Sequence, residues 1–216
     1  YYKNYKNLED SFLQFINKTP PIGKCILCID DKNIKRLKKN IKTKNILTYG
    51  FTSIADYQIV NPKYNIRNCK FDLVVKNFLG KKKVFKNIIV NLIGKHNILN
   101  SVAAISVCLN LGIKIETIKS ALFKFTGVQR RMTKIFEKNK NEFYDDYAHH
   151  PTEIYSVLEG IKKVANKKKI TSVFQPHRFS RVNLLKKKFS KSFKFSDRVI
   201  LCPIYAAGEK MVNKFD

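Results

Sequence analysis

The sequence has 216 residues and a mass of 25.2 kDa, and 44% of the residues are hydrophobic, so the chain can form one large domain or two smaller ones with substantial cores. Its formal net charge is +27, from 43 Lys and Arg against 16 Asp and Glu. No stretch reaches the roughly 18 consecutive apolar residues of a membrane helix, which argues against membrane insertion. The five cysteines are an odd number and lie mostly in apolar runs, which favours reduced thiols and a cytoplasmic protein.

The distribution of the positive charge argues against nucleic acid as the partner, although a basic nucleic-acid-binding protein is the competing class. Lysine is spread along the whole chain, whereas arginine is scarce and two of its pairs fall in short motifs, at residues 130–131 and 178–181. A planar guanidinium group binds carboxylate or phosphate through two parallel hydrogen bonds, which lysine cannot do. This use of arginine predicts a site for an anionic small molecule.

Apolar spacing in the first 127 residues alternates between helix and strand patterns, as in an α/β fold. It predicts helices at 8–16 and 33–41, strands at 25–30 and 45–49, and a hairpin of strands at 70–78 and 84–92. Two helices follow, one from Gly94 to a terminating Gly112 and one at 115–125. A new strand pattern begins after Gly127, so we expect two domains, at 1–127 and 128–216.

The second part is predicted to contain strands at 133–136 and 142–144, a helix that opens with Pro151, a strand at 170–174, a helix at 184–193 and a strand at 198–202. We expect Phe143 and Tyr144 to end a buried strand. Residues 141–209 then form strand–turn–helix units, whose loops would meet at the carboxyl edge of one parallel sheet, where such sheets bind ligands.

The loops of that expected edge carry acids, imidazoles and guanidinium groups in two short runs: Asp145, Asp146, His149, His150, His177, Arg178 and Arg181. One Asp would be enough to cap the helix at Pro151, so the full set indicates a site. Arginine pairs clamp carboxylates or phosphates, and acids beside them can hold a ribose, an amine or a metal-bound phosphate. No nucleophile elbow and no zinc-ligand spacing accompanies them, which argues against hydrolytic chemistry.

Two further motifs each have a functional and a structural interpretation. Asn97 and Asn100 lie three residues apart in the first turn of the helix after Gly94, where side-chain amides can contact the edge of a heterocycle, but Asn97 alone could serve as a helix cap. Cys25 and Cys28 form a CxxC inside a predicted strand with no second ligand pair, which favours a structural role over zinc or redox chemistry.

Five ordered motifs resemble those of the Mur ligase family, over nearly the whole chain from residue 8 to residue 209. They are Gly94–Asn97 with Asn100, Gly127–Arg131, Asp145–Glu153, Gln175–Arg181 and Ile204–Glu209. Any one motif alone would be weak, but five in order are specific. Within the family, residues 175–181 resemble the enzymes that add L-alanine to UDP-N-acetylmuramate. Murein peptide ligases, the alternative within the family, share the double-histidine run but not the pattern at 175–181.

The resemblance implies part of a central ATPase-type α/β domain at 1–127, followed by a Rossmann-like C-terminal α/β domain at 128–216. It also implies a cytoplasmic, ATP- and Mg²⁺-dependent amide synthesis with UDP-N-acetylmuramate and L-alanine as partners. The lactyl carboxylate would be phosphorylated, and the amine of L-alanine would attack the resulting acyl phosphate. Such catalysis depends mainly on positioning and charge neutralisation.

The resemblance also implies roles for single residues. Those that resemble contacts to the adenine are His96, Asn97 and Asn100. Those that resemble contacts to the phosphates and ribose of the nucleotide are Arg131 and Asp146. Those that resemble the site for the amino acid and the acyl phosphate are Tyr147, His149, Arg178 and Arg181, the last three as catalytic residues. The roles of Arg130, Asp145, His150 and His177 are left open, and no metal ligand is assigned.

The chain departs from the family pattern at the phosphate loop. Gly23-Lys24-Cys25 lacks the preceding glycine and the hydroxyl of a Gly-Lys-Thr loop. The UDP-binding domain and the acid and histidine that hold magnesium are also not recognised. We therefore expect a fragment that consists of the later half of the central domain and most of the C-terminal domain. We expect this polypeptide alone to show no ligase activity.

Overall fold

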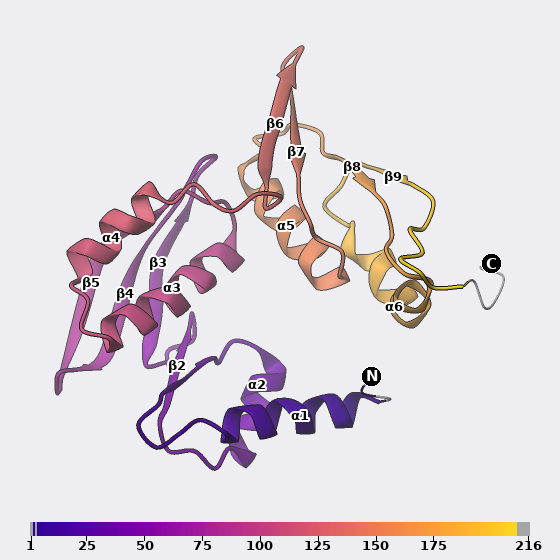
Figure 1. Ribbon diagram of the computed structural model, residues 1–216. Coiled ribbons are helices and arrows are strands. Elements are labelled where there is room, and N and C mark those ends of the chain that lie inside the picture. The colour runs from indigo at the N-terminus through magenta and orange to yellow at the C-terminus, as the bar shows by residue number, and fades with distance from the viewer. Residues whose placement is uncertain (1, 3, 211–216) are drawn as a thin grey trace. The chain divides into compact units, whose positions relative to one another are not determined.

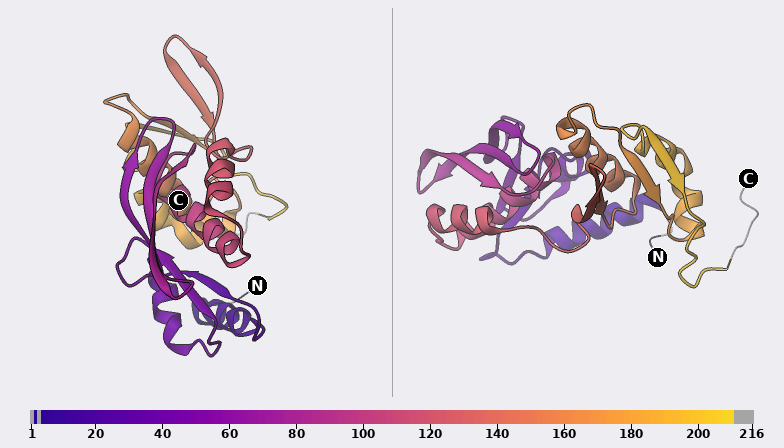
Figure 2. Two further views of the ribbon diagram at one scale, coloured as in Figure 1. Left: turned by 90° about the vertical axis from the view of Figure 1, so that its left-hand side faces the viewer. Right: turned by 90° about the horizontal axis from the view of Figure 1, so that it is seen from above.

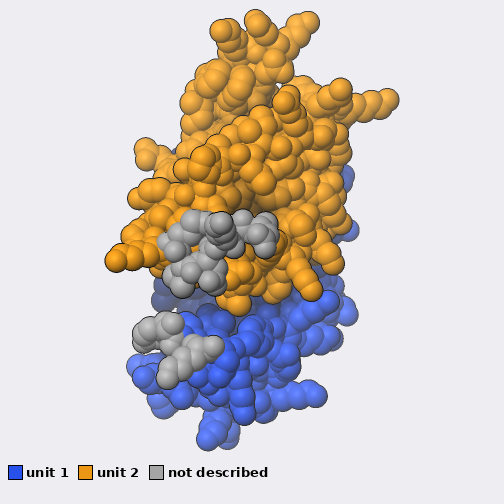
Figure 3. All heavy atoms as spheres, turned by 90° about the vertical axis from the view of Figure 1, so that its right-hand side faces the viewer, with its two compact units in different colours: residues 1–63, 68–91, 96–125 blue, residues 64–67, 92–95, 126–216 orange. Residues whose placement is uncertain are grey.

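The structure is a computed structural model that describes residue 2 and residues 4–210. Contacts divide the chain into two compact units, which Figure 3 shows in two colours. Unit 1 comprises 1–63, 68–91 and 96–125, and unit 2 comprises 64–67, 92–95 and 126–216. Within the described part of the chain, no helix is both long enough and apolar enough to cross a membrane.

Unit 1 is built on a five-stranded sheet in the order β1-β2-β3-β4-β5. The strands are β1 (Cys25–Cys28), β2 (Ile46–Gly50), β3 (Tyr57–Tyr64), β4 (Cys69–Phe78) and β5 (Lys81–Val90). β1 pairs with β2, and β2 with β3, in parallel, whereas β4 and β5 form an antiparallel hairpin. The alternation of helix and strand and the hairpin after residue 69 are therefore confirmed.

The helices of unit 1 agree with the apolar spacing. They are α1 (Tyr5–Asn17), α2 (Lys32–Leu37), continued by a 3₁₀ turn η1 (Lys38–Asn40), α3 (Lys95–Asn110) and α4 (Ile115–Lys124). α3 and α4 lie on the same face of the β3–β5 part of the sheet (Figures 1 and 2). The most deeply buried side chains come from β4, β5 and α3, and they include Phe71, Leu73, Val75, Ile88, Val90, Ile98, Val102 and Ile105.

The apolar pattern did not predict β3. Only the first half of this strand alternates between buried and partly exposed residues, with Tyr57 and Ile59 facing the core. Its second half is exposed and contains Asn61, with a φ of 52°, and Pro62. Proline and a positive φ are both unfavourable in a strand. The apolar pattern of residues 57–64 therefore does not indicate a strand, although these residues pair within the sheet.

Unit 2 contains two separate pairs of strands. β6 (Thr133–Lys138) and β7 (Asn141–Asp145) form an antiparallel hairpin, and β8 (Thr171–Phe174) pairs in parallel with β9 (Arg198–Leu201). The α/β class is confirmed. The prediction that residues 141–209 share one parallel sheet is wrong, because β7 pairs with β6 and not with β8 in the described residues.

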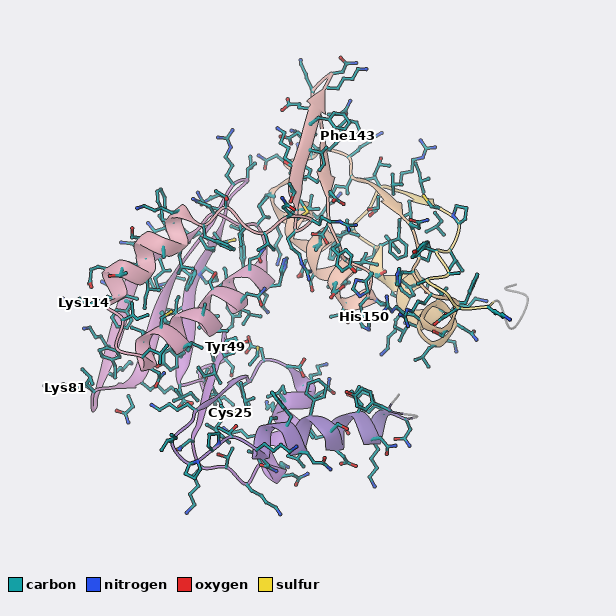
Figure 4. All side chains as sticks on the ribbon, in the orientation of Figure 1. Cys25, Tyr49, Lys81, Lys114, Phe143 and His150 are labelled. Atoms are coloured by element: carbon teal, nitrogen blue, oxygen red, sulfur yellow. The ribbon has the colours of Figure 1, made fainter. Side chains whose placement is uncertain are left out.

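The predicted burial of Phe143 and Tyr144 is also wrong. Their exposed fractions are 44% and 41%, because a two-stranded hairpin leaves both of its faces open. Phe143 stacks on Phe136 across the hairpin, with ring centroids 4.1 Å apart. The hairpin projects from the rest of unit 2, and Figure 4 labels Phe143 on it.

The helices α5 (Pro151–Val164) and α6 (Phe179–Ser192) surround the core of unit 2. Helix α5 begins at Pro151 as predicted, and α6 begins five residues earlier than expected. The core cluster consists of Ile154, Leu158 and Ile170, with partly buried Ala148, Ile161, Ala165, Phe174, Phe189, Phe193 and Phe195 packed against it. This core holds the start of α5 next to the loop after β7 and the end of β8.

Gly50 at the end of β2 provides a test of the packing in unit 1. A Cβ atom at this position would lie 2.6 Å from Oδ1 of Asp30. That carboxylate cannot move freely, because it accepts hydrogen bonds from the amides of Phe51 (2.8 Å) and Thr52 (3.2 Å). Gly50→Ala should therefore lower the free energy of unfolding by about 1–3 kcal/mol, measured by urea denaturation.

The control for this substitution is Asp30→Ala, which removes the carboxylate that the new methyl group would meet. The double variant should cost less than the sum of the two single variants, because contacting residues are not additive. Strict additivity would show that the close approach of Gly50 to Asp30 is not the cause.

Candidate functional site

The loop between β7 and α5 is held by two carboxylates. Asp146 accepts hydrogen bonds from the amide of Met132 (2.9 Å) through one oxygen and from the amide of Ala148 (2.7 Å) through the other. The carboxylate therefore ties the segment before β6 to the loop after β7. A carboxylate has further lone pairs, so this structural role leaves the predicted nucleotide contact of Asp146 untested.

Glu153 fixes the start of α5. Its Oε2 accepts hydrogen bonds from the amides of His149 (3.1 Å) and His150 (3.2 Å). Burial acts to raise the pKa of Glu153, but these two hydrogen bonds and the positive charges of His149 and Arg131 together hold the pKa below the ordinary value. The side chain of His150, labelled in Figure 4, forms the other half of this capping box, because its Nδ1 accepts from the amide of Thr152 at 3.3 Å.

The role of His150, which the sequence left open, is therefore to cap α5. Its Nδ1 can accept the amide hydrogen only when this nitrogen carries no proton. Burial lowers the pKa of His150, and the positive charges of Lys188 and Arg181 act in the same direction. The imidazole is thus held in its neutral form as a helix cap.

His149 has a defined tautomer. Its Nδ1 lies 3.0 Å from the carbonyl oxygen of Tyr147. A carbonyl oxygen can only accept, so Nδ1 carries the proton, and Oε2 of Glu153, 3.7 Å from the same nitrogen, favours that arrangement. In the neutral imidazole, Nε2 then presents its lone pair as a hydrogen-bond acceptor.

Tyr147 is placed by its neighbours on both sides. The guanidinium group of Arg130 lies over its ring at 4.8 Å from the centroid, and the ring of His149 meets it edge-on at 5.1 Å. The amide of Tyr147 donates to the carbonyl of Arg130 at 2.7 Å, and Nε of Arg130 lies 3.4 Å from Asp145. Arg130 and Asp145 thus support the tyrosine.

The segment after β8 reaches the same region of unit 2. The rings of His177 and His149 are 6.4 Å apart, and the ring of His177 is 5.4 Å from that of Tyr205. Burial and the charges of Arg181 and Arg178 lower the pKa of His177. The structure therefore brings the two predicted runs, around His149 and around Arg178 and Arg181, together.

Two polar atoms of this region lack a hydrogen-bond partner among the described residues although they are shielded from solvent. They are Nδ1 of His177 and Nη1 of Arg181. A shielded polar atom without a partner costs roughly 1–3 kcal/mol, more when it is charged. Nη1 of Arg181 is always a donor, so it is suited to an acceptor that a ligand supplies.

The other predicted contacts lie elsewhere. His96, Asn97 and Asn100 lie in the first turns of α3 in unit 1, where Asn100 is exposed and the other two are half-buried. Arg131 is exposed in unit 2, and its positive charge contributes to the low pKa of Glu153. In the described residues, no group of three or more His, Cys, Asp or Glu is placed to hold a metal ion.

The sequence did not assign roles to Glu153, Tyr205 and Glu209. Glu153 could have been recognised as the third residue of a capping box with His150, although histidine is an uncommon cap. Tyr205 and Glu209 lie in the motif Ile204–Glu209, but their partners, His177 and Ser180, are almost 30 residues away in the chain. No local pattern could have shown these contacts.

The CxxC in β1 has the surroundings of a structural pair. Burial raises the pKa of both thiols, Cys25 and Cys28, and a raised pKa makes a thiol a poor nucleophile or metal ligand. Burial, together with the neighbouring thiol of Cys28, also raises the pKa of Tyr49 to about 12. All five cysteines are free thiols.

Comparison with known families gives matches to both parts of the chain. Residues 1–108 match the Mur ligase middle domain, and residues 130–215 match the Mur ligase, glutamate ligase domain. The chain belongs to the Mur ligase family. The resemblance carried by the five motifs is therefore confirmed.

Two curated relatives of this Mur ligase chain bear the name UDP-N-acetylmuramate--L-alanine ligase. The one from Pelagibacter ubique (strain HTCC1062) is 48% identical over 212 residues, which is 98% of this chain and 46% of the relative. The one from Vesicomyosocius okutanii is 40% identical over 216 residues, 98% of this chain and 45% of the relative. The chain thus spans about half the length of these relatives.

The fold also agrees with a solved structure. The crystal structure of the UDP-N-acetylmuramate-alanine ligase MurC from Thermotoga maritima superposes with a TM-score of 0.71 at 24% identity, over 94% of this chain and 42% of that one. At this identity the likeness concerns the fold alone.

The capping role of His150 can be tested by two substitutions. His150→Ala removes the acceptor for the amide of Thr152 and should lower the free energy of unfolding by about 1 kcal/mol. His150→Asn keeps an acceptor and should cost less, as measured by urea denaturation at pH 7.5.

The same variants test the protonation state of His150. The pKa of His150 is lower in the folded chain than in the unfolded chain. The contribution of this residue to stability is therefore complete at a pH above the ordinary pKa of histidine. It is lost as the pH falls further, because the unfolded chain binds the proton first. Between pH 7.5 and 5.5 the stability of the wild type should fall more steeply than that of His150→Asn. The lowered pKa of His177 makes the same contribution to the pH dependence in the wild type and in His150→Asn, so it does not affect the comparison. Equal slopes would contradict a neutral histidine cap.

Proposed function

We propose that this chain is part of an ATP-dependent ligase that joins L-alanine to the lactyl carboxylate of UDP-N-acetylmuramate through an acyl phosphate, in the cytoplasm and in the synthesis of peptidoglycan precursors. Support comes from the names of the relatives at 48% and 40% identity. The observation that carries the proposal is the convergence of His149, Arg178 and Arg181 in unit 2, with Nη1 of Arg181 shielded and unpartnered among the described residues.

The amino acid would bind through its carboxylate to the two arginines. Arg178 and Arg181 provide planar groups of donors, which suit a carboxylate and also the negative charge that develops on the acyl phosphate. Nε2 of His149 presents a lone pair, which can accept a hydrogen bond from the incoming amine and orient it. Tyr147, between Arg130 and His149, would form one wall of this site.

The residues that resemble nucleotide contacts carry groups that suit a nucleotide. In unit 1, the amides of Asn97 and Asn100 and the imidazole of His96 offer donors and acceptors that suit the edge of adenine. In unit 2, Arg131 suits phosphate and Asp146 suits a ribose hydroxyl. This division agrees with a boundary near Gly127, with the central domain at 1–127 and the C-terminal domain at 128–216, and with the separate family matches of the two parts.

Magnesium fits this chain only as a partner of the nucleotide. The described residues offer no cluster of metal ligands, and the ion would be held largely by the phosphate oxygens of the nucleotide. When bound, it would neutralise phosphate charge during transfer. The residues described above act on the carboxylate and the amine.

The activity can be tested in a hybrid enzyme in which residues 1–216 replace the matching segment of the Pelagibacter ubique relative. The hybrid should release phosphate from ATP only when both L-alanine and UDP-N-acetylmuramate are present. Arg181→Ala should lower kcat/KM for L-alanine by about 10–100-fold, because hydrogen bonds to charged groups contribute roughly 1.5–3 kcal/mol.

Arg198→Ala provides the control, since it removes an exposed arginine of β9 from the same unit and should leave kcat/KM near that of the hybrid. Use of a free tripeptide in place of L-alanine would instead indicate a murein peptide ligase. A folded hybrid that binds duplex DNA regardless of sequence and responds to neither ATP nor L-alanine would refute the ligase function.

A further inference from the structure

The beginning of α6 carries both arginines and has an unusual local structure. Arg178 is the N-cap residue, with a φ of 70°, and its side chain makes no capping hydrogen bond. A sparsely populated backbone conformation of this kind costs a non-glycine residue about 1–3 kcal/mol, so the surroundings must hold it in place. No acidic residue lies in the first turn.

Glu209 supplies the missing cap from a distant part of the chain. Its Oε2 accepts from the amide of Ser180 at 3.0 Å, and its Oε1 accepts from the hydroxyl of Ser180 at 2.6 Å. These hydrogen bonds, together with the charge of Arg178, lower the pKa of Glu209. The carboxylate is therefore ionised at neutral pH and lies where the free amides of a helix would otherwise attract an anion.

Residues 205–209 also hold the turn before α6 through backbone hydrogen bonds. The amide of Arg178 donates to the carbonyl of Tyr205 at 2.9 Å, and the amide of Tyr205 donates to the carbonyl of Pro176 at 2.8 Å. The amide of Glu209 closes the segment on the carbonyl of Ala206 at 3.0 Å. Residues 205–209 thus bracket the turn, with Tyr205 before Arg178 and Glu209 after it.

This arrangement decides which donors remain for a ligand. Ser180 of α6 is already bonded to a carboxylate of the chain, whereas Nη1 of Arg181 has no partner among the described residues. An incoming anion would therefore meet the guanidinium groups first. Competition with Glu209 would make binding at the helix end itself unfavourable.

We propose that Glu209 is a positioning residue, which caps α6 in place of a ligand, holds the turn that carries Arg178 and Arg181, and leaves the two guanidinium groups as the receptor for the carboxylate of the substrate. That the ligand is an amino acid rests on the proposed function. The placement of the anion at the arginines and not at the helix end does not depend on it.

The test uses the 216-residue chain, with inorganic phosphate as the probe and nuclear magnetic resonance as the readout. In the wild type, phosphate should shift the side-chain Nε signals of Arg178 and Arg181 and leave the amide of Ser180 unchanged. In Glu209→Ala, the Ser180 amide should respond to phosphate, and the arginine signals should broaden or move because the turn is released. Glu209→Gln, which keeps one acceptor, should lie between the two and serves if the alanine variant does not fold.

A second readout reports the charge itself. Glu209 raises the pKa of His177 against the effect of the two arginines, so in Glu209→Gln the imidazole of His177 should titrate at lower pH than in the wild type. Glu159→Gln, which removes a carboxylate 3.5 Å from Lys163 on α5, is the matched control and should leave both readouts unchanged.

Two results would overturn the proposal. One is a Ser180 amide that responds to phosphate equally in the wild type and in Glu209→Gln. The other is a Glu209→Gln protein with unchanged Ser180, arginine and His177 signals. Absence of any effect of phosphate on either arginine in the wild type would also refute the placement of the anion at the arginines. The proposed function is tested separately by the kinetics of the hybrid enzyme, so the two failures are distinguishable.

Discussion

The loops of this protein depend on hydrogen bonds from backbone amides to ionised carboxylates. In unit 2, Glu153 holds the two amides before α5, Asp146 joins two segments on either side of the β6–β7 hairpin, and Glu209 caps α6. In unit 1, Asp30 binds two amides after β2. Such charge-assisted hydrogen bonds are roughly twice as strong as neutral ones, and each of these carboxylates holds a loop or a helix start in place.

The composition gives this use of acids a physical reason. Sixteen Asp and Glu face 43 Lys and Arg, and positive charges contribute to the lowered pKa of Glu153, Glu209 and Asp197. Several of these acids accept hydrogen bonds from backbone amides. The candidate site follows from this arrangement, because the same carboxylates that fix the turns direct His149, Arg178 and Arg181 towards one region of unit 2.

Much of the fold could be predicted because its signals are local. The apolar spacing of α1, α3 and α4, the hairpin β4–β5 and the proline at the start of α5 each lie within a few consecutive residues. The sequence failed where the outcome depends on partners far away. β3 is a strand because the sheet supplies its neighbours, and Phe143 is exposed because β7 pairs with β6 alone in the part of the chain that the structure describes.

The site shows the same division between local and distant information. Its residue types and spacing identified the runs around His149 and Arg178, and their closeness agrees with the expectation even though they do not lie on one parallel sheet. The roles of individual residues could not be predicted from the sequence. His150 caps a helix, and the importance of Glu209 comes from a contact with Ser180 that spans 29 positions of the chain.

The carboxylates with lowered pKa also determine how the protein should respond to acid. Glu153, Glu209 and Asp197 stabilise the fold when ionised, and this contribution is lost as the pH falls through their pKa values in the folded state. In unit 1, hydrogen bonds from the side chain of Asn61 and the amide of Asn87 likewise lower the pKa of Asp72 on β4. Acidification would therefore loosen the turns that carry the two arginines together with the polar links between β3, β4 and β5, so ligand recognition and stability should decline together.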